Sequence, residues 1–130
     1  MRLVLCFVAA LAAACGNSSD LPAAPDPITG MWGGDRVRLT LAANGGQLDF
    51  DCAHGTITSA LAPRDDGSFT VPGFYQVEGG AARDPIERQP TTFSGRITGN
   101  SMTISFTVNN QPLGPYTLTR DRETILRRCL

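Results

Sequence analysis

The sequence contains no lysine, and this absence limits the partners that the protein can have. All of its positive charge comes from arginine, and 11 basic residues face 12 acidic ones, for a formal net charge of −1. No segment concentrates basic residues as a nucleic-acid-binding surface does, so we expect no nucleic acid partner. The chain also has no convincing helical periodicity, a single histidine and a single tryptophan. It therefore offers little material for a metal centre or for acid–base catalysis.

Long apolar runs are absent except at the N-terminus, where residues 3–14 follow a positively charged Arg2. That run is too short to cross a bilayer as a helix, which takes about 20 residues. A short apolar run behind a positive residue is typical of an export signal. We therefore assign residues 1–14 to a signal peptide, residues 15–28 to a flexible tether and residues 29–130 to one folded domain.

The junction Leu11-Ala12-Ala13-Ala14-Cys15 resembles the lipobox of bacterial lipoproteins. The resemblance implies that Cys15 is lipidated and becomes the new N-terminus, which would anchor the domain to a membrane of the cell envelope. The stretch departs from the family at Ala12, where leucine is preferred, and the alternative is an ordinary secretory signal cleaved at an Ala-x-Ala site. The family's inner-membrane proteins carry aspartate after the cysteine. Gly16 therefore favours the outer membrane, at its periplasmic face or at the cell surface.

This processing determines which cysteines remain available for a disulfide. Cleavage removes Cys6 and acylation uses Cys15, which leaves Cys52 and Cys129. In an oxidising compartment an even remainder of two predicts one disulfide. Such a bond would close a loop of about 75 residues and stabilise the fold by about 4 kcal/mol in the chain-entropy model.

The folded region shows the period-two alternation of half-buried β-strands. Turn residues such as Asn44-Gly45-Gly46 and Gly99-Asn100-Ser101 separate the alternating segments. The predicted strands cover residues 37–41, 47–52, 57–61, 68–71, 74–78, 93–97, 102–108 and 116–120. About eight short strands at this spacing predict an all-β antiparallel meander that closes into a small up-and-down β-barrel. Residues 109–114 are expected to form a turn, residues 79–91 an exposed loop, and Ile125 and Leu126 to run toward Cys129.

Gly30-Met31-Trp32 opens the first strand and resembles the Gly-x-Trp signature of the calycin superfamily, the lipocalins and avidins. The resemblance implies that Trp32 closes one end of a barrel and that a late arginine packs across its ring. Arg120 is the position that we match to this arginine, ahead of Arg122. A calycin-like protein would bind a small apolar ligand in a cavity behind Trp32.

A second motif, Phe50-x-Cys52-x-x-Gly55, precedes a cysteine near the C-terminus and follows a lipobox. This combination resembles the membrane-bound inhibitors of C-type lysozyme, which are small β-barrel lipoproteins. The family's Ser-Gly-x-x-Tyr stretch is missing, and Ser94-Gly95-Arg96 is only partly similar to it. An inhibitor of this kind would have a filled barrel and a protruding loop, for which residues 79–91 are the candidate.

Few residues could take part in catalysis, metal binding or ligand binding. His54 lacks a serine in a nucleophile-elbow context, so a hydrogen-bonded or exposed strand-end histidine is the favoured interpretation. A metal site would need His54 with Asp35, Asp49 or Asp51, but alternation places Asp49 and Asp51 on the outer face, and we predict no metal and no cofactor. The aromatic residues are more typical of a packed core than of a ligand cavity, because small barrels are usually filled. Tyr75 and His54 remain the candidate contacts for a ligand or partner.

These observations favour a monomeric, non-enzymatic, lipid-anchored binding or structural module of the bacterial cell envelope. Its ligand would be an unknown small apolar molecule or an envelope protein. The alternative is an inhibitor of lysozyme or of another protein that acts through an exposed loop, and an enzyme built on His54 ranks last.

Lipidation at Cys15 is directly testable by metabolic labelling. Labelled palmitate should enter the wild-type protein and should be absent from Cys15→Ser, because only the lipobox cysteine carries the lipid. Cys6→Ser is the matched control and should be labelled like the wild type. Equal labelling of the Cys15→Ser variant would exclude the lipoprotein assignment.

Overall fold

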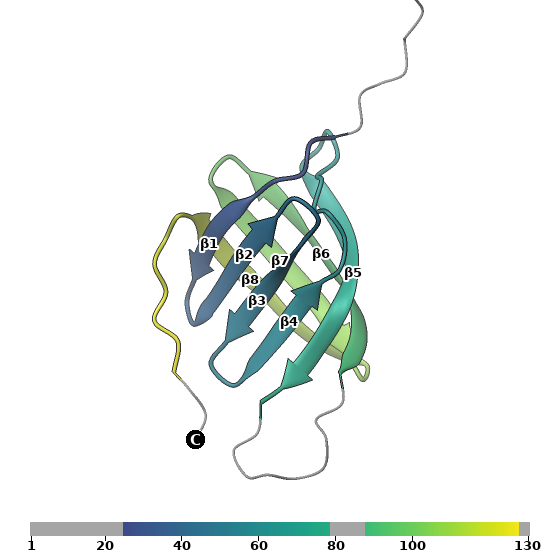
Figure 1. Ribbon diagram of the computed structural model, residues 1–130, viewed down its shortest axis with the longest axis vertical. Helices are drawn as coiled ribbons and strands as arrows, with labels where there is room; N and C mark the ends of the chain where they lie inside the picture. The colour runs from purple at the N-terminus through teal and green to yellow at the C-terminus, as the bar shows by residue number, and fades with distance from the viewer. Residues whose placement is uncertain (1–24, 79–87, 128–130) are drawn as a thin grey trace, which may run out of the picture.

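The computed structural model describes residues 25–78 and 88–127, and this part of the chain is all-β. Each strand pairs antiparallel with the next one along the chain, and the last pairs with the first, which closes a barrel (Figure 1). The strands are β1 (Gly30–Gly34), β2 (Val37–Ala42), β3 (Gly45–Phe50), β4 (Ala53–Ile57), β5 (Ser68–Val77), β6 (Gln89–Thr98), β7 (Ser101–Val108) and β8 (Gln111–Arg120). The predicted fold class is confirmed. Within the described ranges, no helix is long and apolar enough to cross a membrane.

Tight turns set the register of the hairpins. Asn109 and Asn110 connect β7 to β8 with φ angles of 50° and 63°. Asparagine tolerates this left-handed conformation better than most residues, which suits a two-residue hairpin turn. The turn expected over residues 109–114 is therefore shorter than predicted, because β8 already begins at Gln111.

The positions of β3 and β4 differ from the prediction. Strand β3 ends at Phe50. The turn consists of Asp51 and Cys52, and β4 follows at once over Ala53–Ile57, whereas the sequence predicted a strand over residues 57–61. The inward-facing positions of β4 include Ala53 and Gly55. Such small residues give little apolar signal, so the period-two pattern was not visible here. Residues 122–127, which include Ile125 and Leu126, form no strand.

Strand β5 is continuous, whereas the sequence predicted two strands separated by Pro72-Gly73. Pro72 is exposed on the outer face and pairs with Thr92, and Gly73 pairs with Thr91. A Cβ atom on Gly73 would lie only 2.7 Å from Cε2 of Phe93. The glycine is thus required for space inside the barrel and does not interrupt the strand.

Side chains fill the interior of the barrel. The buried core residues come from all eight strands and pack as one cluster that includes Trp32, Leu39, Leu48, Ile57, Phe69, Phe93, Met102, Ile104 and Leu118. Phe93 occupies space that a glycine leaves free, since a Cβ on Gly55 would come within 3.0 Å of its Cζ. A core of this kind removes apolar surface from water at about 25 cal/mol per Å².

The two ends of the barrel differ. At the end where β1 begins, called here the tether end, the backbone N–H of Ile28 donates to the carbonyl of Leu61 over 2.9 Å, and Leu61 is fully buried. The opposite end, called here the aromatic end, is bounded by the β1–β2, β3–β4 and β7–β8 turns. Among the described residues, Ile28 lies at the tether end, and Arg127 lies near the aromatic end, where it contacts Asp51 of the β3–β4 turn (Figure 1).

Trp32 lies at the point where the barrel closes. It is fully buried, and it pairs with Arg120 in the β1–β8 ladder. The guanidinium carbon of Arg120 lies 4.4 Å from the centre of the indole ring, the geometry of a cation–π contact. The indole N–H has no hydrogen-bond partner among the described residues. Packing and the arginine therefore hold the ring, as the sequence analysis expected for this pair.

The Trp32–Arg120 contact can be measured by a double-mutant cycle in urea unfolding. Trp32→Ala should destabilise the fold by about 3 to 5 kcal/mol, because a large buried ring is lost. Arg120→Ala should cost about 0.5 to 2 kcal/mol, and the two losses should not add because the side chains touch.

Arg122→Ala is the matched control, since no contact of its guanidinium with Trp32 is seen among the described residues. Its effect should add to that of Trp32→Ala. Additivity of the Trp32 and Arg120 losses would show that the contact does not contribute to stability.

Candidate functional site

Aromatic rings close the aromatic end. Phe50 lies 5.1 Å from Tyr116 and 6.1 Å from Tyr75, and Tyr75 lies 5.2 Å from Phe106, measured between ring centres. Burial raises the pKa of both tyrosine hydroxyls above their ordinary value of 10.0. Rings packed against one another occupy this end of the barrel, so Tyr75 lies among packed side chains.

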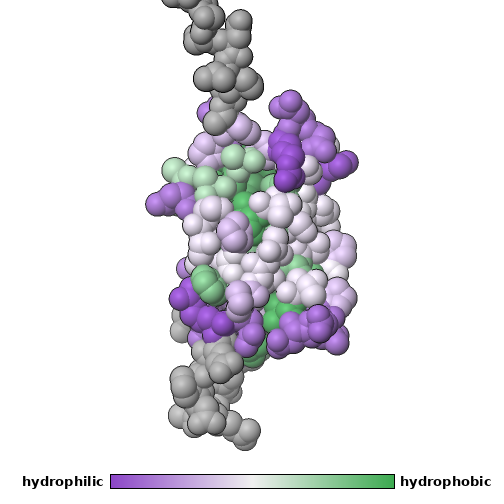
Figure 2. All heavy atoms as spheres, turned by 90° about the vertical axis from the view of Figure 1, so that its right-hand side faces the viewer, coloured by the Kyte–Doolittle hydropathy of each residue, from purple (hydrophilic) through white to green (hydrophobic). Residues whose placement is uncertain are grey.

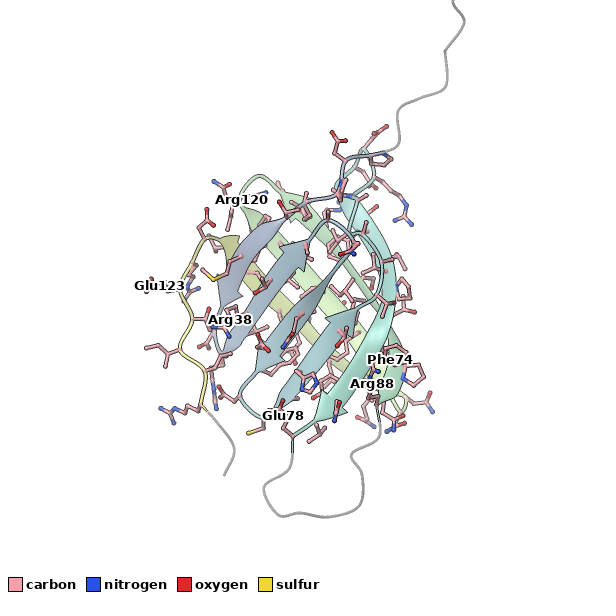
Figure 3. The ribbon with its side chains drawn as sticks, viewed as in Figure 1. Arg38, Phe74, Glu78, Arg88, Arg120 and Glu123 are labelled. Carbon is pink, nitrogen blue, oxygen red and sulfur yellow. The ribbon has the colours of Figure 1, made fainter. Side chains whose placement is uncertain are left out.

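His54 is on the outer surface of the barrel wall. Its Nδ1 lies 2.6 Å from Oε1 of Glu78, at the end of β5 where Figure 3 labels the glutamate. The β4–β5 register pairs Tyr75 with Gly55, so Tyr75 faces the interior while His54 faces out. The structure therefore does not bring the two candidate contact residues onto one surface, and His54 is the hydrogen-bonded strand-end residue that the sequence favoured.

The acidic residues near His54 form ion pairs with arginines. Asp49 lies 3.3 Å from Nη2 of Arg38, and Asp51 pairs with Arg36. Asp49 faces outward from β3, as the alternation predicted, whereas Asp51 lies in the β3–β4 turn. Among the described residues, no three His, Cys, Asp or Glu side chains converge in a way that could hold a metal ion. Paired charges at a hairpin end solubilise and position the turn.

The C-terminal segment lies along the outside of β1. Gly33 accommodates it, since a Cβ atom there would lie 2.0 Å from the carbonyl oxygen of Arg122. The hydroxyl of Thr124 donates to the carbonyl of Gly34 over 3.1 Å, and the backbone N–H of Arg127 donates to Oδ1 of Asp51 over 2.8 Å. The hydrogen bond from Arg127 is the main cause that lowers the pKa of Asp51 below 3.8, and Arg36 lowers it further against the effect of burial.

This segment bears on the predicted disulfide. Cys52 follows Asp51 in the β3–β4 turn, and Cys129 is two residues after Arg127 in the sequence. The Arg127–Asp51 hydrogen bond places Arg127 beside the turn that contains Cys52. Cys129 and the lipidation candidate Cys15 lie outside the described residues, and both assignments stay predictions. Most of the loop candidate, residues 79–87, lies outside them as well, and Gln89–Thr91 belong to β6.

A groove opens where β6 and β7 separate. Their ladder runs from Thr98–Ser101 to Ser94–Ser105 and stops there. Strand β6 continues to Gln89 paired with β5, and β7 continues to Val108 paired with β8. A register shift in the β7–β8 ladder between Ile104 and Phe106 accompanies the separation. The opening between the strands, called here the seam groove, has a volume of about 700 Å³.

Uncharged residues line the seam groove. Six carry hydroxyl groups, and they are Thr70, Thr91, Thr92, Ser94, Ser105 and Thr107. Phe106 and Leu113 provide apolar surface, and Pro112 and Pro115 lie on the β8 side. The hydroxyl of Thr91 donates to the carbonyl of Thr107 over 2.8 Å and bridges the two walls. The groove is therefore suited to a neutral ligand, since none of its described lining residues is charged.

Charge is distributed unevenly around the barrel. The outward positions of β6 to β8 are mostly serine and threonine, with Thr103 pairing with both Arg96 and Thr117. Arg38 on β2 and His54 on β4 form charged pairs, Arg36 and Asp51 pair between the β1–β2 and β3–β4 turns, and Arg96 on β6 lies 3.8 Å from Asp66. Figure 2 shows the side on which β5 lies, which is largely pale in its middle, with strongly hydrophilic residues gathered toward the two ends.

One exposed aromatic contact was not found from the sequence. Phe74 points outward from β5, and the guanidinium carbon of Arg88 lies 4.2 Å from its ring centre (Figure 3). The sequence analysis placed Phe74 among the core or cavity aromatics. The outward position is what the alternation between the inward-facing Gly73 and Tyr75 requires.

Comparison of the chain with protein-family models, with curated proteins and with solved structures found no match.

The anchoring of the C-terminal segment should depend on pH through Asp51. Since its pKa is lowered in the folded protein, the ionised carboxylate favours the anchored state. That contribution is present above the ordinary pKa of 3.8 and is lost as the pH falls through the lowered value. The amide NMR signal of Arg127, followed from pH 6 to pH 2, should shift with a midpoint below 3.8.

Asp51→Asn should abolish this titration, because the amide side chain cannot lose its proton. Asp49→Asn, two residues earlier on β3, should leave it unchanged. A midpoint above 3.8, or a titration that persists in Asp51→Asn, would show that another group controls the segment.

Proposed function

We propose that this protein is a non-enzymatic, lipid-anchored binding module of the bacterial cell envelope, and that it binds through the outside of its barrel at the seam groove. The lipobox-like junction before Cys15 supports the anchor. The fold supports a binding or structural role, because small barrels present shaped surfaces on a rigid wall. The single histidine is held by Glu78 and does not line the groove.

The main support for this proposal is that side chains fill the interior of the barrel, whereas its outer surface contains the seam groove. A calycin-like binder of apolar molecules requires a cavity behind Trp32, but Trp32, Leu39 and Phe93 are fully buried in one packed cluster. The seam groove, at about 700 Å³, is large enough for a small ligand or a segment of a partner. We therefore place binding on the exterior.

The inhibitor alternative is favoured by the same filled core, since a module of that kind acts through a protruding segment and not through a cavity. In that case the partner would contact the aromatic end, where β5 leaves the barrel at Val77 and β6 enters it at Gln89. The two proposals differ in the surface that they use, and NMR mapping can separate them.

Amide shifts of the full-length protein in detergent micelles can locate the binding surface. The probes are chitotetraose, the peptide acetyl-Thr-Val-Thr-Val-Thr-amide and palmitate, which represent a neutral saccharide, a neutral peptide and an apolar molecule. At least one of the two neutral probes should shift the amides of Thr92, Ser94 and Thr107. Shifts of the Trp32 indole by palmitate alone would support interior binding and contradict the proposal, as would the absence of any groove shift.

Thr92→Trp should reduce binding of that probe by about tenfold or more, because an indole would fill the groove at an exposed position on its wall. Thr40→Trp is the matched control, since Thr40 is an exposed threonine on β2 between Met31 and Gln47. It should leave binding unchanged. Equal losses in the two variants would indicate a general effect of the added ring.

A further inference from the structure

We infer that the seam groove binds an extended, uncharged peptide segment of another protein, which adds to the barrel wall as a β-strand beside β6. This inference rests on the proposed function and names the class of ligand.

Part of β6 has a neighbouring strand on one side only. Gln89–Phe93 pair with β5 on one side, while the described residues supply no strand on the other, because the β6–β7 ladder ends at Ser94–Ser105. Main-chain N–H and C=O groups need partners, and a strand with one free side is a template for another strand. The five residues span about 17 Å at about 3.3 Å each, and Pro90 within them has no N–H, so it provides only its carbonyl.

The opposite wall offers a main-chain group as well. The carbonyl of Thr107 points into the groove, since it accepts the hydroxyl hydrogen of Thr91 from the other wall. A side-chain hydroxyl thus occupies the place where a ladder hydrogen bond would be expected. A strand between the walls would present its own N–H groups to this carbonyl and displace the threonine bridge.

The lining indicates what kind of strand fits. The groove residues carry no charge, although 18% of the whole sequence is charged. Burying an unpaired charge there would be costly, so a segment without charged side chains is favoured. Leu113, which is only partly buried, would contact apolar side chains of the segment, and the hydroxyls of Thr92 and Ser94 would contact polar ones. This alternation is the mode of recognition used in β-strand addition.

Regularly spaced main-chain groups favour a peptide over a saccharide. A neutral saccharide could use the same hydroxyls, but carbohydrate sites generally rely on exposed aromatic faces. The aromatic residue of this groove, Phe106, is only 4% exposed. The saccharide is therefore the competing outcome of the test.

The test compares the acetyl-Thr-Val-Thr-Val-Thr-amide peptide with the same peptide N-methylated at both valines. Methylation keeps the side chains but removes two N–H groups from one edge of the strand. The unmodified peptide should shift the groove amides, and methylation should weaken its affinity by about tenfold or more, since the two valine N–H groups on that edge can no longer donate. Thr92→Trp should abolish binding and Thr40→Trp should not.

Each other outcome is decisive. Equal affinity of the two peptides would overturn strand addition and leave the proposed function intact. Groove shifts from chitotetraose without any from the peptide would also overturn the inference and keep the groove as the binding site. If neither probe shifts the groove, both the inference and the proposed function fail.

Discussion

The narrowness of the barrel is the constraint on which the rest of the structure depends. Eight short strands enclose too little space for both large side chains and a ligand, and the protein uses that space for Phe93, Phe106 and Trp32. Glycines on the neighbouring strands make room for the rings, as Gly55 and Gly73 do for Phe93. Because the interior is used for stability, recognition has to take place on the wall or at the ends.

The two halves of the outer surface of the barrel differ in the charge of their side chains. Arginine–carboxylate pairs and the His54–Glu78 pair cover β2 to β5 near the aromatic end, and neutral hydroxyls cover most of β6 to β8. Exposed ion pairs contribute little to stability, so their main effects are on solubility and on the position of the C-terminal segment. The neutral half can approach another neutral surface without stripping water from charges. The separation of β6 from β7 lies in this half.

Sequence patterns located most of the fold but not the site. Residues such as Met102, Ile104 and Phe106 alternate cleanly, so β7 was predicted almost to its ends, and Trp32 and Arg120 were paired because their motif positions matched a known arrangement. Strand β4 was misplaced because Ala53 and Gly55 carry little apolar signal. The seam groove depends on where one ladder stops and on a register shift after Ile104, and no local pattern encodes either feature.

The ladder between β1 and β8 also determines when the barrel can form. It joins Gly34 to Leu118 and Trp32 to Arg120, pairs that are more than about 80 residues apart in the chain. Long-range pairing of this kind is slow, because the loop must close before the contacts stabilise it. A chain that emerges from a translocation pore N-terminus first would hold Trp32 exposed until nearly all of its residues had crossed. In the exported protein that we propose, assembly of the barrel would therefore follow the passage of β8, and chaperones would bind before it.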